Sequence, residues 1–249
     1  MCLLALFFRA VDDAAVVVGA NREEAYARGG EPPRVLPGPV PSIAGIDPQA
    51  KGTWLGVNRR GVLVAVTNRP KSRVPERRRS RGLLARDLLA CTNAREATDL
   101  GAKELSHDGY AGCNVLCADR HDAYALHSGD WLRIRPLPPG LHVMTAHDVN
   151  ETNDPRIAHA LGWLGQRRYY TGLECIVALQ ELCAQGGGDG PLMCIRSELG
   201  GTVSSTIVAL RAPLTRSTYL HAQGPPDTTP YQDYSHLLEE LASTRSNGE

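Results

Sequence analysis

The order of strand-like and helix-like segments constrains the fold of this chain more than any other sequence feature. Apolar and β-branched runs at residues 2–8 and 14–20 predict a hairpin, and helical patterns follow at 81–91 and 93–105. More strand patterns come next, then two more helices, then strands again. Because strands and helices come in blocks without βαβ alternation, the order predicts two antiparallel sheets covered by helices, an α+β arrangement distinct from a Rossmann fold or a barrel.

The remaining elements follow from the same periodicities. We expect strands at 53–58, 62–68, 112–118, 122–128, 131–137, 140–145, 193–195, 204–211 and 217–222, and helices at 155–164, 172–185 and 234–242, with a glycine turn at 186–190. The four strands between residues 112 and 145 predict one antiparallel meander. Residues 29–50 are rich in proline and glycine, so we expect a long ordered loop there without a helix or an inner strand.

Length and composition bound the class of protein. A chain of 249 residues suits one domain, which we place at residues 1–242 with a polar tail at 243–249. Lysine plus arginine and aspartate plus glutamate both number 27, so no net charge favours nucleic acid as a partner. The seven cysteines are odd in number and lack Cys-x-x-Cys spacing, which indicates reduced, buried thiols. With no signal peptide and no apolar run long enough to cross a bilayer, we expect a cytoplasmic protein.

Two segments have both a structural and a functional interpretation. Residues 69–81 are rich in arginine and lysine and hold one acidic residue, Glu76, so they form either a solvated loop or a contact for an anionic ligand. Cys113 and Cys117 share one face of a strand, but no nearby histidine or cysteine completes a tetrahedral set. We therefore predict no metal site.

The second residue, Cys2, is the main candidate for chemistry. Its simplest interpretation is one more apolar residue of the first strand, because free cysteine is among the most buried residue types. Aminopeptidases remove Met1 when the next residue is small, however, and Cys2 would then carry both a thiol and a free α-amino group. That amine titrates near neutral pH and can act as the base for the thiol, as in N-terminal nucleophile catalysts. Asn68, at a strand exit, is the best-placed amide for an oxyanion hole.

Several short motifs, in this order and spacing, resemble one known family over nearly the whole chain. They are Met1-Cys2, Asn21-Arg22-Glu23-Glu24, Gly52-Thr53-Trp54-Leu55-Gly56, Thr67-Asn68, Ser80-Arg81-Gly82 and Tyr110 to Asn114. The chain resembles the NRDE family, also called the transport and Golgi organisation 2 family, which is named after the second motif. The resemblance implies the N-terminal nucleophile (Ntn) hydrolase fold, a four-layer αββα sandwich, in agreement with the predicted element order.

The resemblance also implies roles for individual residues. Cys2 stands at the nucleophile position, Arg22 resembles an arginine that lies beside the thiolate, and Asn68 resembles an oxyanion-hole amide. Further ligand contacts are expected at Asn21, Glu23, Glu24, Trp54, Arg81 and His147. Arg22 is expected just beyond the second strand. The alternative to a role beside the nucleophile is that Arg22 and both glutamates form a solvated turn at the end of the hairpin.

Three positions depart from the family pattern. Glu23 stands where the family name has aspartate. Ala146 stands where cysteine Ntn hydrolases carry a second catalytic asparagine, and Val203 stands where the family tends to have arginine. Arg196, upstream of Val203, is the alternative source of a guanidinium there, and we do not rely on it as a replacement. Because losing one oxyanion donor typically costs 10²- to 10³-fold in rate, these departures bear directly on hydrolysis.

Three functions follow from this combination. The first is handling or trafficking of a haem-like or acyl-CoA-like metabolite in a pocket at Cys2, with no required cofactor and haem as a bound ligand. For haem, His142, His147 and Cys2 are candidate axial ligands. The second is a cysteine amidohydrolase that cleaves a linear or cyclic amide. The third is a structural or interaction role without chemistry. The expected partner is a small molecule, either a haem-like or acyl-CoA-like ligand or an amide substrate, and we expect neither nucleic acid nor an integral membrane segment.

Overall fold

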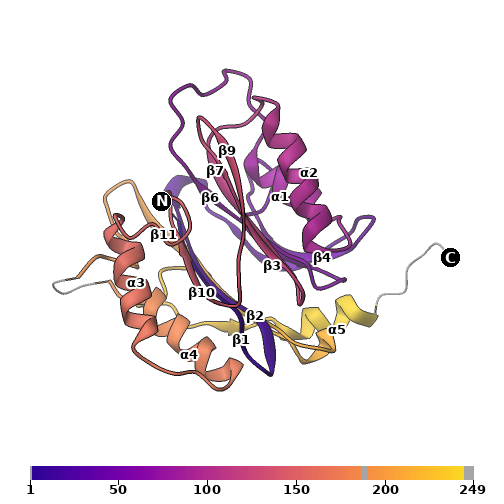
Figure 1. Cartoon of the computed structure of the whole chain (residues 1–249), viewed down its shortest axis with the longest axis vertical. Coiled ribbons are helices and arrows are strands. Elements are labelled where there is room, and N and C mark those ends of the chain that lie inside the picture. The colour runs from indigo at the N-terminus through magenta and orange to yellow at the C-terminus, as the bar shows by residue number, and fades with distance from the viewer. Residues whose placement is uncertain (1, 187–189, 244–249) are drawn as a thin grey trace.

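The computed structural model describes residues 2–186 and 190–243 and contains two antiparallel sheets. The six-stranded sheet has the order β10-β1-β2-β11-β12-β13, and the seven-stranded sheet has the order β3-β4-β5-β6-β7-β8-β9. Figure 1 shows α3 and α4 on one side of the molecule and α1 and α2 on the other, with the strands between them. The predicted αββα arrangement is therefore confirmed.

The bounds of the elements are as follows. The six-stranded sheet comprises β1 (Leu3–Val11), β2 (Ala14–Ala25), β10 (Gly140–Met144), β11 (Gly200–Leu210), β12 (Thr218–Ala222) and β13 (Gln232–Asp233). The seven-stranded sheet comprises β3 (Glu31–Leu36), β4 (Ser42–Ile46), β5 (Leu55–Asn58), β6 (Leu63–Asn68), β7 (Cys113–Ala118), β8 (Ala123–Ser128) and β9 (Leu132–Pro136). The helices are α1 (Arg81–Leu88), α2 (Ala94–Ser106), α3 (Pro155–Gly165), α4 (Gly172–Cys183) and α5 (Ser235–Ser243), with short 3-10 turns η1 (Tyr26–Arg28) and η2 (Leu214–Arg216).

Alternation along a strand places successive buried apolar side chains in different apolar layers. In β1, Leu4 and Leu6 pack into the core between the two sheets, whereas Leu3 and Ala5 pack under α3 and α4. A third apolar layer fills the space between the seven-stranded sheet and the helices α1 and α2. Cys2 is two residues before Leu4, so its side chain belongs to the face between the sheets.

The helices begin where the sequence predicted. Ser80, Asn93, Asp154 and Thr171 each accept a backbone N–H of the first turn of α1, α2, α3 and α4. Glu96, in the first turn of α2, accepts hydrogen bonds from the backbone N–H and the hydroxyl of Thr92.

The expected loop at residues 29–50 is wrong, because two strands lie within it. Pro32 and Pro33 occupy an irregular part of β3, which is an edge strand and so tolerates residues without N–H donors. β4 is an inner strand between β3 and β5. A Cβ on Gly45 would lie 2.6 Å from the Trp54 ring, so glycine lets the indole pack against the strand.

Two other expectations need correction. β10 does not complete the predicted meander, because it leaves β7–β9 and pairs with β1 in the other sheet. Residues 193–195 form no strand, and the neighbouring Arg196 makes only an isolated bridge to Gly201. Three predictions fall wholly or partly outside the described residues. They concern the tail at 243–249, of which only Ser243 is described, part of the glycine turn at 186–190, and the processing of Met1.

The cysteines agree with the predicted reduced state. All seven thiols are free, and six are buried while Cys2 is partly exposed. Cys113 and Cys117 pack in the apolar layer beneath α1 and α2. Over residues 2–186 and 190–243, no helix has the length and apolar character to cross a membrane, and no group of three histidine, cysteine or acidic side chains could hold a metal ion.

Candidate functional site

Cys2 lies at a cavity of about 300 Å³ where the N-terminal end of β1 meets the seven-stranded sheet. The side chain belongs to the face between the sheets, and its Sγ is 4.0 Å from the carbonyl oxygen of Glu23. The last paired residues of β1 and β2 are Leu3 and Asn21, so continuing the register puts Cys2 opposite Arg22. Cys2, Arg22 and Asn68, the three residues implied for catalysis, all line this cavity.

Arg22 lies within β2, which continues to Ala25, and not beyond the strand as expected. Its guanidinium is buried: one Nη donates to the carbonyl of Gly29 at 2.5 Å, and the other is 3.7 Å from Asp47. The guanidinium carbon lies 4.4 Å from the centre of the Trp54 ring. Burial lowers the pKa of Arg22, while the charges of Glu24 and Asp47 oppose that change. Arg22 is thus a fixed part of the cavity wall.

Asp47 forms ion pairs with both Arg22 and Arg28 in this wall. Its carboxylate accepts from Nε and Nη2 of Arg28 at 2.8 and 2.7 Å and from the backbone N–H groups of Gln49 and Ala50. Although burial acts in the opposite direction, these hydrogen bonds hold the pKa of Asp47 below its ordinary value. Arg28 also pairs with Glu24 at 3.4 Å. The carboxylate of Asp47 therefore stays ionised beside Arg22.

A close contact between two glycines brings Trp54 and Arg81 to the same cavity. A Cβ on Gly52 would lie 2.3 Å from the backbone of Gly82, and the Thr53 N–H donates to the Gly82 carbonyl at 3.0 Å. The segment before β5 and the first turn of α1 can approach this closely only without side chains. Both motifs containing these glycines therefore have a packing role in building the cavity.

The basic segment 69–81 is partly a rim of the cavity. Arg79 is held by ion pairs to Asp87 and a hydrogen bond to the Tyr110 hydroxyl, and Arg81 donates to the carbonyl of Gly112 at 2.8 Å. Arg78 also lines the cavity, and within the described part of the chain its side chain has no hydrogen bond or ion pair. It is the cation at the rim best able to meet an anionic ligand.

Asn68 ends β6 opposite Cys113 and contributes to the cavity wall. Its side-chain amide makes no hydrogen bond to any described residue, so both its donor and its acceptor can contact a ligand. The preceding residue, Thr67, faces the other way and donates to the carbonyl of Thr145 at 2.6 Å. This contact anchors the segment that follows β10.

The environment of the Cys2 thiol favours its protonated form. Burial raises the pKa of Cys2, and the neighbouring Glu23 adds to this, whereas the backbone hydrogen bond to Glu23 and the charge of Arg22 act in the opposite direction. Since the thiolate is the nucleophile, a further nearby cation is needed for reactivity near neutral pH. An α-ammonium group on Cys2 itself, which removal of Met1 would create, is such a cation.

Three of the expected ligand contacts have other surroundings. Asn21 is buried on the opposite face of β2, where its Nδ2 donates to the carbonyls of Cys183 and Met193 at 2.9 Å. The Glu23 carboxylate is held by Arg156 of α3, with one N–O distance of 3.1 Å, although Glu23 also borders the cavity. His147 does not line the cavity and instead contacts Asp154 at 2.9 Å.

At two positions that depart from the family pattern, Ala146 and Val203, the side chain offers neither an amide nor a guanidinium. Ala146 is buried and lies outside the cavity lining. Val203 lies in an irregular part of β11, between Thr202 and Ser204. Arg196 is bound to Asp227 at 2.7 Å, so it does not provide the missing guanidinium at Cys2.

Sequence reasoning missed Asp47 and Arg28. Arg28 is four residues after Glu24, a spacing that signals an ion pair between neighbouring turns. Asp47 precedes Pro48 in the segment interpreted as a covering loop, and nothing local reveals that it faces Arg22. Arg28 follows β2 directly in η1, whereas Asp47 reaches the wall because it follows β4, which returns the chain to this end of the molecule.

Two sheets between helical layers, with a cysteine at the start of the first strand facing a cavity, define a protein of the Ntn-hydrolase fold class. Solved structures agree. A Caenorhabditis elegans N-acylethanolamine-hydrolyzing acid amidase ortholog aligns with a TM-score of 0.58 at 14% identity, covering 83% of this chain and 92% of its own. Penicillin V acylase from Agrobacterium tumefaciens gives 0.57 at 13% identity, covering 89% and 83%. A variant of conjugated bile acid hydrolase from Clostridium perfringens gives 0.52 at 12% identity, covering 98% and 95%.

The family follows from the sequence comparison. Residues 1–167 match the family model described as Transport and Golgi organisation 2, and the chain belongs to that family. No curated protein matches the chain at a significant level. At 12 to 14% identity the similar structures establish the fold.

Proposed function

We propose that this protein is a hydrolase that uses Cys2 to cleave a C–N amide bond in a small substrate bearing an anionic group. The observation that carries the proposal is the convergence of Cys2, Arg22 and Asn68 on one cavity. The titles of the similar structures name an amidase, an acylase and a hydrolase, which supports the same reaction class.

The reaction can be written with the groups at the cavity. The Cys2 thiolate attacks the carbonyl carbon, and Asn68 donates its amide N–H to the oxyanion of the tetrahedral intermediate. The C–N bond breaks, the departing amine takes the proton that the α-amino group of processed Cys2 removed from the thiol, and a thioester remains. Water then hydrolyses the thioester and restores the thiol.

Substrate size and charge follow from the cavity. A volume of about 300 Å³ is at the lower end of the range for ligand pockets, so the acyl portion is small. Arg78 at the rim is available to pair with a carboxylate or phosphate of the substrate. Because Ala146 provides no second amide, we expect turnover well below that of an enzyme with two side-chain donors.

A second candidate is binding without turnover of an acyl-CoA-like or haem-like metabolite, in a cytoplasmic handling or trafficking role. The raised pKa of Cys2 favours this alternative, because a protonated thiol marks a pocket without being a strong nucleophile. The arginines at the rim suit the anionic groups of either ligand. Support for haem is weaker, since the lining residues include no histidine and Cys2 would be the axial ligand.

One experiment separates these functions. Purified protein is first checked by intact mass for loss of Met1, then incubated with a panel of small N-acyl amino acids and amides. Mass spectrometry follows any acyl adduct on Cys2 and any released amine. A hydrolase gives an adduct on Cys2 that is absent in Cys2→Ala, while Cys91→Ser, which changes a buried thiol outside the cavity, retains it.

The alternatives give different results. Processed protein that binds acyl-CoA or shifts the haem Soret band, without an adduct or released product, supports the binding role. Protein that does neither, with Cys2 alkylated by iodoacetamide no faster than the other thiols, contradicts both and leaves the structural role.

A further inference from the structure

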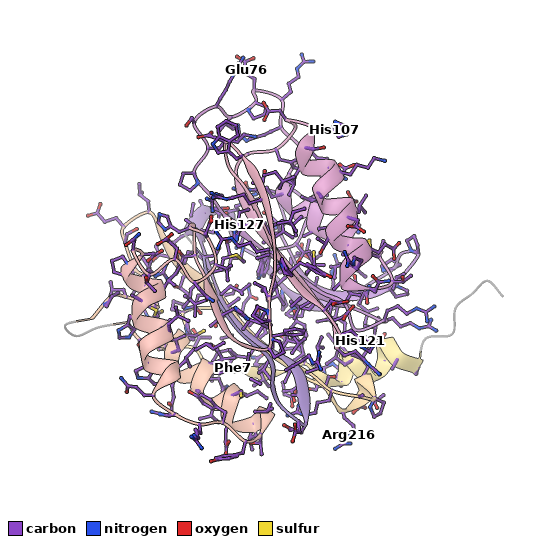
Figure 2. All side chains as sticks on the ribbon, viewed as in Figure 1. Phe7, Glu76, His107, His121, His127 and Arg216 are labelled. Carbon is purple, nitrogen blue, oxygen red and sulfur yellow. The ribbon has the colours of Figure 1, made fainter. Side chains whose placement is uncertain are left out.

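A second and larger cavity lies at the other end of the sandwich. Its volume is about 520 Å³, and turns from both sheets form its wall. The β1–β2 turn supplies Asp12 and Asp13, the β5–β6 turn supplies Arg59 and Arg60, the β7–β8 turn supplies Arg120, and the connection from β11 to β12 supplies Arg216. Figure 2 shows Glu76, close in sequence to Arg78 of the Cys2 cavity, at the upper end of the molecule and Arg216 at the lower end.

The charge of this second cavity is unbalanced. Five arginines line it against two aspartates, whereas the chain as a whole is neutral. Asp13 and Arg211 contact each other at 3.4 Å, and Asp13 also accepts the N–H of Gly172 at 2.7 Å. Asp12 is then the remaining acidic side chain in the wall.

Four arginines of the wall have no partner among the described residues. Within the described part of the chain, the guanidinium groups of Arg59, Arg60, Arg120 and Arg216 make no hydrogen bond or ion pair. Several cations around one cavity repel each other, and a bound anion relieves that repulsion. These arginines lie on connections between paired strands, so strand pairing fixes the position of their backbone.

The guanidinium groups favour phosphate over a single carboxylate. Each arginine presents a planar fork that matches two phosphate oxygens, and four forks from three separate connections exceed what one carboxylate can accept. The lining also includes an apolar run, Leu210, Ala212, Pro213 and Leu214, which only Arg211 interrupts. An apolar wall beside a cationic one fits an organic molecule that carries its phosphates at one end.

We propose that this cavity, distinct from the one at Cys2, binds an organic ligand with two or more phosphate groups, of the size of a nucleoside diphosphate. Arg59, Arg60, Arg120 and Arg216 hold the phosphates, and the apolar wall contacts the organic portion. The same chemistry occurs in a free nucleotide and in a polyphosphorylated lipid headgroup.

Calorimetric titration of the full chain with pyrophosphate and with ADP, in buffer without divalent cations, tests the proposal. We expect binding of both, tighter for ADP because of the apolar wall and weaker at high salt. Each of Arg120→Gln and Arg216→Gln is expected to weaken binding by roughly three- to tenfold, as for a charge-assisted contact that remains partly exposed. Arg168→Gln, an exposed arginine on the loop between α3 and α4, is the matched control and binds as the unmodified protein does.

Further measurements decide where and to what the anion binds. Arg78→Gln distinguishes the two cavities: a loss of pyrophosphate binding in Arg78→Gln but not in Arg120→Gln would move the anion to the Cys2 cavity and overturn the proposal. Vesicles of phosphatidylcholine with and without phosphatidylinositol bisphosphate test the lipid source. Binding to charged vesicles in preference to ADP assigns the phosphates to a headgroup, and no binding to pyrophosphate, ADP or vesicles refutes the site.

Discussion

The guanidinium carbon of Arg22 lies 4.4 Å from the centre of the Trp54 ring, which stacks a residue of the motif in β2 on a residue just before β5 in the other sheet. The same guanidinium donates to the carbonyl of Gly29. The motif arginine therefore joins the two sheets at the cavity, and its role is as much structural as electrostatic.

Replacing Arg22 by lysine should reveal this structural role. Lysine keeps the charge but loses the planar stack and the directed contact to Gly29, so we expect a loss of about 1 to 3 kcal/mol in the free energy of unfolding. Urea unfolding measures the loss. Arg34→Lys in the exposed edge strand β3 is the control, with an expected change below about 0.5 kcal/mol. Equal effects in the two variants would contradict the role given to Arg22.

The contact between Gly52 and Gly82 should tolerate no side chain. A Cβ on Gly52 meets the Gly82 backbone at 2.3 Å, so Gly52→Ala must push the start of α1 away from the segment before β5. We expect a loss of more than about 2 kcal/mol in unfolding free energy, measured by urea denaturation.

Gly162→Ala provides the matched control for this clash. Gly162 lies within α3, and a Cβ there has nothing within 4 Å. Because alanine favours helix over glycine, this variant should gain roughly 0.5 to 1 kcal/mol. If both alanine variants shift stability in the same direction, backbone contact at Gly52 is not the deciding factor.

Asn114 should be among the costliest polar residues to remove. It is fully buried, and its Nδ2 lies within 3.2 Å of Thr67 Oγ1 and of the carbonyls of Thr145 and His147. Asn114→Ala leaves these acceptors short of a donor, so we expect a loss of about 3 kcal/mol or more by urea unfolding.

The exposed Asn153 is the comparison for Asn114. Asn153→Ala should change stability by less than about 0.5 kcal/mol. A destabilisation confined to the range of the Asn153 variant would show that the network is dispensable.

His127 predicts the direction of the pH dependence of stability. Its Nδ1 contacts the Oδ1 of Asn114 at 2.8 Å, and that oxygen also accepts from Arg69, so the ring nitrogen must be the donor. Burial, together with Arg69, Arg135 and Arg133 and opposed by Asp148, lowers the pKa of His127 to about 4. The unfolded chain thus binds more protons between pH 6.5 and 4, and stability falls as pH decreases through this window.

The expected loss is about 2 kcal/mol between pH 7.5 and pH 5. Urea unfolding at several pH values should show a shallower dependence in His127→Gln than in the unmodified protein. His107→Gln, at the exposed end of α2, should leave the slope unchanged. Parallel curves for the unmodified protein and His127→Gln would assign the acid loss to other groups.

Local sequence features identified the elements that depend on local chemistry. The apolar start of β1 and the helical patterns that begin at residues 81 and 172 placed the first strand and two helices, because strand and helix periodicity involve only nearby residues. The end of β2 was missed, since Arg22 and its acidic neighbours look like a solvated turn until the opposite strand is known.

Long-range pairing explains the other differences. The prolines of β3 and Gly45 of β4 look like breakers, but an edge position and the Trp54 ring make them compatible with a sheet. Within the site, Cys2 and Asn68 line the cavity, whereas Asn21 and His147 do not. Asn21 points to the opposite face of β2, and His147 is held by Asp154. Neither arrangement can be predicted from a short motif.

Because β1 pairs with β10, the first strand of the chain cannot complete its pairing until a much later segment has been synthesised. Leu4 is paired with Met144, a residue that leaves the ribosome on the order of ten seconds or more after the N-terminus. During that interval the β1 edge that β10 will occupy lies open, and the start of the chain is accessible to an aminopeptidase. Under the proposed mechanism, processing that exposes an amine on Cys2 is easiest in this interval, so the rate of translation and the supply of processing enzyme would together decide how many molecules carry it.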